Sequence, residues 1–200
     1  EEEYANRWII LIAFLMGLSI GVHLLNLLTI PALVLVYYFR KYEFTWRGFV
    51  ISTILLFIIL ALLLFGLIPG LVTLATKFDL FFVNTLSLPV NSGMIFLSLL
   101  LTAFFVLSIR ATLLPKGENK KIIFAAVALF LSGIWIISGS VILNLLLLAA
   151  VIYFVWITAT RNTQLLNTVL TTIAVILIGY SSTAIIVIRS SANPPLDENN

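Results

Sequence analysis

Five apolar runs, each close to the length of a membrane-spanning helix, constrain this chain more than any other feature. They cover residues 49–68, 94–109, 122–138, 141–158 and 165–188, and each is closed by charge, proline or glycine. A helix needs about 20 apolar residues to cross about 30 Å of hydrocarbon. Hydrophobic residues make up 62% of the chain and charged residues 10%, whereas soluble domains average about 45–50% and 25%. The sequence therefore predicts an all-α, polytopic transmembrane helix bundle, with residues 1–200 forming a single transmembrane domain.

The run at residues 8–39 differs from the others because it contains no formal charge over 32 residues. A single helix of that length would extend about 48 Å, which exceeds the hydrocarbon thickness, yet the run is too short for two full spans. Its middle holds glycines, His23 and Asn26, which favour a break near residues 21–26. Two interpretations remain open: a hairpin of two short helices, which gives seven membrane segments, or one kinked helix, which gives six.

The distribution of lysine and arginine predicts the orientation. In the hairpin interpretation, only Lys77 and Arg189 lie on the side opposite the other nine basic residues, and the lysine- and arginine-rich side of a membrane protein is normally cytoplasmic. The loop 69–93 and the tail 189–200 are then expected to face outward. Residues 70–88 are apolar over most of their circumference, which is typical of a helix lying at the outer membrane interface.

His23 and Asn26 are the first candidate binding residues. An ionisable side chain inside an apolar run often has a function, such as contact with substrate or proton handling. The alternative for His23 is a neutral imidazole bonded to a backbone carbonyl freed by the break. Asn26 would line the same turn, although asparagine equally often bonds neighbouring membrane helices.

Two further candidates belong to the outward side. Asp79 lies beside Lys77 in the interfacial segment, where it is either a general base or metal ligand, or a solvated surface charge. Arg189 follows the last apolar run in "IRSSANPP" and suits bidentate phosphate recognition, although a cation also stabilises a helix C-terminus. Asn193 in the same stretch adds an amide that favours a phosphate or headgroup site. The pairs Gly17/Gly21 and Gly66/Gly70 have the spacing that lets membrane helices approach closely.

Several classes of chemistry are not supported by the sequence. The chain has no cysteine and one histidine, which excludes disulfides and makes a zinc site improbable. No carboxylate or lysine lies in a predicted span, which argues against an ion-coupled pump or exchanger. The net charge of +3 reflects basic residues at the ends of spans, so we expect no nucleic-acid partner. No catalytic residue, metal ligand set or cofactor is assigned.

Three stretches resemble a bacterial family of very hydrophobic, multi-spanning proteins, common in the Bacteroidetes and related to eukaryotic protein O-mannosyltransferases. They are "GLSIGVHLLNLLTIPAL" at 17–33, "FDLFFVNTLSLPVNSG" at 78–93 and "GYSSTAIIVIRSSANPPLDENN" at 179–200. The resemblance covers essentially the whole chain, and the last stretch is its most specific part. It implies a C-type glycosyltransferase architecture, in which a sugar is transferred from a polyprenyl-phosphate donor at the outer face of the membrane.

The resemblance also implies what to expect around this chain. Enzymes of this kind carry a catalytic acid in an early outward loop, which this sequence does not contain, so we expect the chain to be a middle fragment that is inactive alone. Its partners would be membrane lipid, the polyprenyl-phosphate donor and the remainder of a longer polypeptide. The membrane would be the bacterial inner membrane, with 69–93 and 189–200 in the periplasm. A transporter or lipid flippase segment and a non-catalytic membrane scaffold are the alternatives.

Overall fold

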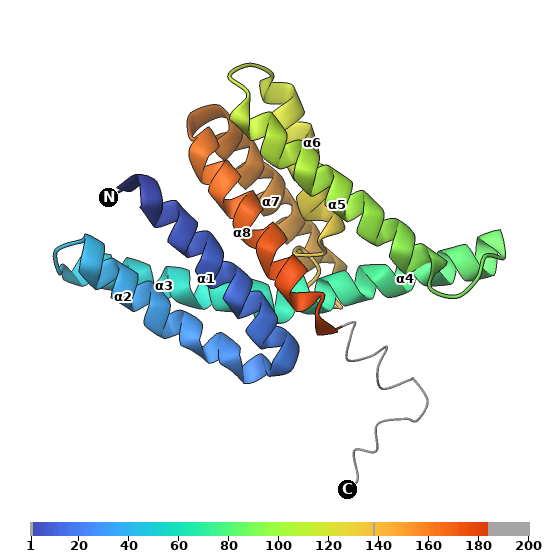
Figure 1. Ribbon diagram of the computed structural model, residues 1–200, viewed down its shortest axis with the longest axis horizontal. Helices are drawn as coiled ribbons and strands as arrows, with labels where there is room; N and C mark the ends of the chain where they lie inside the picture. Colours follow the sequence, from blue (N-terminus) through green and yellow to red (C-terminus); the bar gives the residue numbers. More distant parts are fainter. Residues whose placement is uncertain (1, 138, 184–200) are drawn as a thin grey trace, which may run out of the picture. The chain divides into compact units, whose positions relative to one another are not determined.

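The computed structural model describes residues 2–137 and 139–183, and every element within them is a helix (Figure 1). The predicted all-α class is confirmed. Four helical stretches are long and apolar enough to cross a membrane: Trp46–Leu86, Ser92–Leu113, Val141–Arg161 and Thr163–Tyr180. The total of six or seven membrane segments stays a prediction, because among the described residues the other helices do not reach both this length and this apolar character.

The chain divides into two compact units by their internal contacts, and its organisation as a single transmembrane domain stays a prediction. The first unit comprises Glu1–Thr29 and Thr171–Asn200, and the second comprises Ile30–Leu170. The first unit joins the two ends of the chain, a pairing that no local sequence pattern indicates.

In the first unit, helix α1 (Glu2–Val22) packs against the second half of α8 (Thr163–Tyr180). Glycines make the close approach possible. A methyl group on Gly17 would meet the backbone of Ile176, and one on Gly179 would lie 2.7 Å from the carbonyl oxygen of Phe14. The predicted role of Gly17 in close helix packing is confirmed, and Gly179 lies on the facing helix.

The run at residues 8–39 is broken immediately after α1. His23 is extended, with φ −151° and ψ 116°, and a short 3-10 helix η1 (Leu24–Leu28) leads into α2 (Thr29–Lys41). The interruption therefore lies in the segment 21–26, which the sequence marked by its glycine and polar residues. The angle between the two helices stays a prediction.

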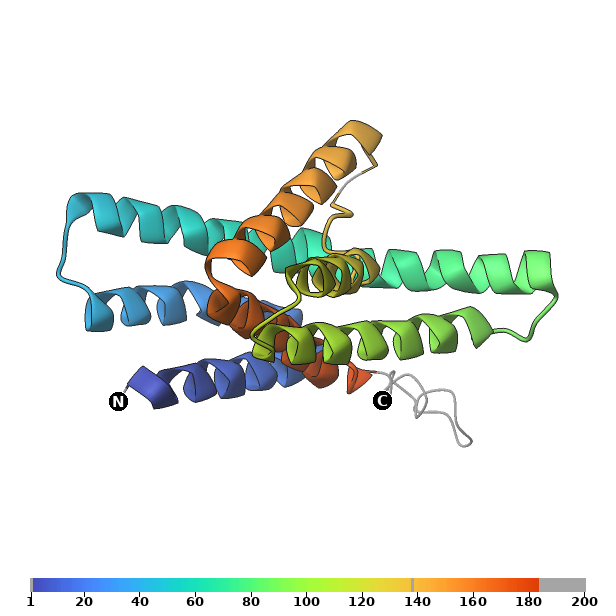
Figure 2. The same ribbon diagram turned by 90° about the horizontal axis from the view of Figure 1, so that it is seen from above.

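In the second unit, a single helix runs from Trp46 to Leu86 without a turn (Figures 1 and 2). It consists of α3 (Trp46–Ala61), a π-helical segment η2 (Leu62–Leu67) and α4 (Ile68–Leu86). The sequence predicted that the span 49–68 ends before Pro69, because proline lacks an N–H and clashes with the carbonyl four residues earlier. The structure differs there: the wider π turn precedes the proline, and the backbone N–H of Ile68 bonds five residues back to Leu63.

This helix is about 61 Å long at 1.5 Å per residue, roughly twice the hydrocarbon thickness. The segment 70–88, predicted to be a separate interfacial helix, is therefore mostly the continuation of α3. Its orientation to the membrane is still a prediction. At Ser87 the chain adopts a left-handed conformation, with φ 54°, and turns into α5 (Ser92–Leu113), which packs on α4.

The predicted span at 122–138 is shorter in the structure. Helix α6 (Glu118–Leu131) ends where Gly133 takes a φ of +75°. The turn that follows packs against the long helix: a methyl group on Gly66 would lie 2.6 Å from the carbonyl oxygen of Ile134, and Gly70 meets the backbone of Gly133. Gly66 and Gly70 therefore do allow a close approach, but the backbone that they contact is the turn after α6 and not another helix. Helix α7 (Val141–Arg161) follows and leads into α8.

Candidate functional site

The break after α1 places a small polar cluster at one end of the first unit. The carbonyl of Ser19 accepts two hydrogen bonds, from the backbone N–H of His23 at 2.8 Å and from Nδ2 of Asn26 at 3.1 Å. Thr29 donates through Oγ1 to the carbonyl of Asn26 at 2.7 Å. The side chain of Asn26 therefore stabilises the break itself.

His23 lies in the same break but has a different environment. Its side chain is exposed, whereas that of Asn26 is half-buried. His23 is therefore the member of the pair that a bound ligand can reach without disturbing the turn. Whether its imidazole binds substrate or bonds to a backbone carbonyl freed by the break stays a prediction.

Two hydroxyl-bearing residues from the end of α8 lie beside this break, and sequence analysis did not single them out. A methyl group on Gly21 would lie 2.9 Å from Oγ of Ser182 and 3.3 Å from Cγ2 of Thr183. The sequence does show the polar stretch "YSST" at 180–183 inside the last apolar run, but not that it lies beside Gly21. Two of the stretches that carry the family resemblance, 17–33 and 179–200, thus meet here.

Arg189 and Asn193, the predicted phosphate-binding residues, lie outside the described residues. Their sequence position is six and ten residues after Thr183, which is the last described residue of the chain. The assignment of a phosphate site to them stays a prediction.

Asp79 belongs to the second unit and makes a specific contact there. Its Oδ1 accepts the backbone N–H of Gly93 at 3.1 Å, in the first turn of α5. A methyl group on Gly93 would meet the backbone of Phe78, so the two helices touch at this point. A carboxylate at a helix N-terminus satisfies an otherwise unpaired N–H and complements the helix dipole. The contact accounts for Asp79 structurally.

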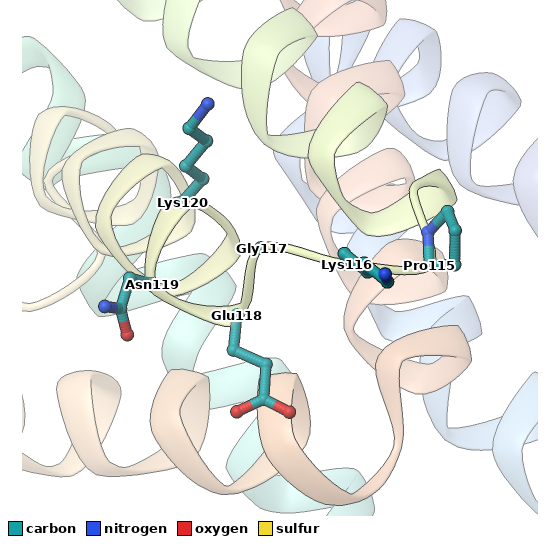
Figure 3. A pocket seen from close by; sticks show the side chains of 6 residues that line it. All are labelled: Pro115, Lys116, Gly117, Glu118, Asn119 and Lys120. Carbon is teal, nitrogen blue, oxygen red and sulfur yellow. The ribbon is translucent and has the colours of Figure 1, made fainter.

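A surface depression also lies in the second unit, at the turn between α5 and α6. It has a volume of about 520 Å³ and is lined by residues 115–120. Figure 3 shows that the side chains of Glu118, Asn119 and Lys120 point in different directions. Side chains that diverge do not make a binding site for one ligand, and we assign the depression no chemistry.

Within the described ranges, no three histidine or acidic side chains gather as metal ligands would. The polar cluster around His23 offers an imidazole, hydroxyls and an amide. These groups suit hydrogen bonding to a phosphate or a sugar, and the described residues of the cluster include no carboxylate.

Comparison with known proteins gives one match. Residues 1–46 match the family described as the protein O-mannosyl-transferase TMEM260 N-terminal domain. No curated protein and no solved structure matches the chain. The matched segment contains α1, the break at His23 and Asn26, and α2. The first 46 residues of the chain are therefore similar to the N-terminal domain of protein O-mannosyltransferases.

Proposed function

We propose that this chain is part of a membrane glycosyltransferase that transfers a sugar, most simply mannose, from a polyprenyl-phosphate donor at the outer face of the membrane. The observation that carries the proposal is the match of residues 1–46 to a protein O-mannosyl-transferase domain. The apolar helices that follow give a lipid-linked donor a surface of matching polarity. The inner bacterial membrane is the proposed location.

The proposed donor site lies at the end of the first unit. His23 and the hydroxyls of Ser182 and Thr183 would bond the sugar or its phosphate, and Arg189 with Asn193 would complete the phosphate contacts. An arginine forms paired hydrogen bonds with phosphate oxygens that a lysine cannot reproduce.

Sugar transfer by membranes containing the full-length protein tests the proposal. Radiolabelled mannosyl polyprenyl phosphate is supplied, with a mannosyl nucleotide as the comparison donor. We expect transfer from the lipid donor only, and a rise of at least tenfold in the donor KM for Arg189→Ala, with a smaller rise for Arg189→Lys. His23→Ala should also raise the donor KM.

Other outcomes point to the other functions. Movement of the polyprenyl-linked sugar across a vesicle bilayer without transfer to an acceptor would identify a flippase. If the protein neither transfers the sugar nor moves the lipid-linked sugar across the bilayer, the result would favour a scaffold role. An unchanged KM in Arg189→Ala, with transfer intact, would remove the phosphate assignment while leaving the enzyme class in place.

A further inference from the structure

The turn between α2 and α3 carries a continuous cluster of aromatic rings. Six rings from residues 38–49 are linked by centroid distances of 5.3 to 6.3 Å: Tyr38, Phe39, Tyr42, Phe44, Trp46 and Phe49. We call residues 37–49 the aromatic turn. Most of these rings are exposed, and Trp46 is 74% exposed, so the cluster presents aromatic surface outward instead of filling a core.

Hydrogen bonds of the buried Tyr38 and of Thr45 stabilise the conformation of the aromatic turn. Tyr38, which is only 6% exposed, donates through its hydroxyl to the carbonyl of Thr45 at 3.2 Å and accepts the N–H of Thr45 at 3.2 Å. Oγ1 of Thr45 in turn accepts the N–H of Gly48 at 3.1 Å and caps α3. The exposed side chains are therefore held on a defined backbone.

The aromatic turn also contains three cations and a single acid, Glu43. Arg40, Lys41 and Arg47 are all exposed, and Nζ of Lys41 lies 5.6 Å from the ring centre of Tyr37. Arg40 and Lys41 lie in the last turn of α2, where a positive charge is favourable to the helix dipole. Arg47 lies in the first turn of α3, which contains no acid, so the dipole disfavours it and the helix does not explain its presence.

We propose that the aromatic turn is a binding surface for the headgroups of anionic phospholipids. Tyrosine and tryptophan concentrate where the hydrocarbon meets the headgroups, and the apolar stretch that begins at Trp46 is long enough to cross a membrane. Cations placed beside those rings then lie at the depth of lipid phosphates. Each basic residue near an anionic surface strengthens binding by about fivefold.

Two observations favour lipid over a protein partner. The rings and the cations are interspersed over residues 37–49, next to the start of a stretch long enough to cross a membrane, which places them at the depth of the headgroups. The cations also outnumber the acid, so the charge is complementary to an anionic leaflet. The proposal does not depend on the glycosyltransferase activity.

The test measures lipid preference of the full-length protein in nanodiscs that contain phosphatidylcholine with increasing phosphatidylglycerol. Spin-labelled phosphatidylglycerol and phosphatidylcholine report the lipids held at the protein surface. We expect the unmodified protein to prefer phosphatidylglycerol by at least tenfold, with the preference falling as salt is raised. Arg40→Gln, Lys41→Gln and Arg47→Gln combined should reduce the preference about tenfold or more.

The matched control removes the same charge elsewhere in the second unit: Lys116→Gln, Lys120→Gln and Arg161→Gln combined. These three side chains are exposed and lie outside the aromatic turn. The control should keep the preference for phosphatidylglycerol. Equal loss in both variants, or no preference in the unmodified protein, would overturn the proposal. If the triple variant fails to fold by circular dichroism, Arg47→Gln alone should lower the preference about fivefold.

Discussion

Glycine at position 70 illustrates how single residues set helix distances in this chain. Its Cα faces the backbone of Gly133, and Gly133 itself needs a φ of +75° that residues with a side chain rarely adopt. The contact joins the long helix to the turn that ends α6. Any side chain at position 70 must push backbone away from backbone, which a well-packed interior resists.

At this scale we predict that Gly70→Ala lowers the free energy of unfolding by about 1–3 kcal/mol, the usual cost of overpacking. Thermal melting in detergent, followed by circular dichroism, measures the loss. Gly139→Ala is the control, because nothing lies within 4 Å of a methyl group at that position. If the Gly70→Ala protein is as stable as the control, the backbone at Gly133 can move to accommodate the methyl group without a loss of stability.

Asp79 allows a test that separates its structural contact from chemistry. Asp79→Asn keeps an oxygen that can accept the N–H of Gly93, whereas Asp79→Ala loses it. We expect a loss of about 1 kcal/mol in stability for the alanine variant and a smaller loss for asparagine, measured by the same melts.

Activity distinguishes the two roles of Asp79. If the carboxylate only caps α5, the full-length Asp79→Asn protein should keep its sugar-transfer rate. Lys77→Ala, an exposed neighbour, should change neither stability nor rate. Loss of transfer in Asp79→Asn with stability intact would restore the general-base hypothesis.

Among the elements, α5 and the first half of α8 are joined by a polar contact in an apolar surrounding. Nδ2 of Asn167 donates to Oγ1 of Thr112 at 2.7 Å, and Thr112 donates to the carbonyl of Ile109. Thr112 is buried and Asn167 is half-buried. Hydrogen bonds between membrane helices contribute about 0.6 kcal/mol on average and up to about 1.7 kcal/mol.

We therefore predict a coupling free energy of about 0.6–1.7 kcal/mol between these two residues. A double-mutant cycle of Asn167→Leu and Thr112→Val measures it by reversible unfolding in detergent. The cycle isolates the pairwise contribution. Additive effects of the two substitutions would mean that the bond adds nothing to helix association.

The elements also show where sequence reasoning succeeds and where it stops. Helices and their apolar character follow from composition, and the break at His23 lies where glycine and polar residues weaken a helix. The helix that continues through Pro69 was not predictable, because the π turn that accommodates the proline leaves no local signature. The early end of α6 depends on Gly133 packing against Gly70, a contact 63 residues apart in the chain.

The candidate site shows the same division. His23 and Asn26 could be identified because polar residues stand out in an apolar run. Ser182 and Thr183 could not, because their position beside Gly21 depends on pairing between the two ends of the chain. The contact between Asp79 and Gly93 spans a turn whose geometry depends on the left-handed residues Ser87 and Asn91.

At the scale of the whole molecule, the predicted orientation can be tested directly, since the chain has no cysteine of its own. Figure 2 shows the α2–α3 turn and the α4–α5 turn at opposite ends of the long helix. We expect Glu43→Cys and Asn119→Cys to react with a membrane-impermeant maleimide only after the cells are opened. Ser87→Cys should react in intact cells, after the outer membrane is permeabilised.

This labelling pattern also tests the positive-inside assignment. Glu43 and Ser87 lie in turns, Asn119 lies in the first turn of α6, and all three are exposed, so each should react once the reagent reaches it. Labelling of Glu43→Cys and Ser87→Cys from the same side would reject the orientation. It would mean that α3 and α4 together do not carry the chain across the bilayer.

The π-helical segment at Leu62–Leu67 controls the rotational phase of everything after it. A residue in an α-helix turns the chain by about 100°, and a π turn holds one residue more than the regular ladder. If the unchanged sequence formed a regular α-helix here, the extra residue would swing Gly70 and Asp79 about 100° around the axis, away from Gly133 and Gly93. Deleting Leu64 would restore a regular helix and keep both residues in phase. The π turn therefore sets the rotation of α4 about its axis, which keeps Gly70 facing Gly133 and Asp79 facing Gly93 on one continuous helix.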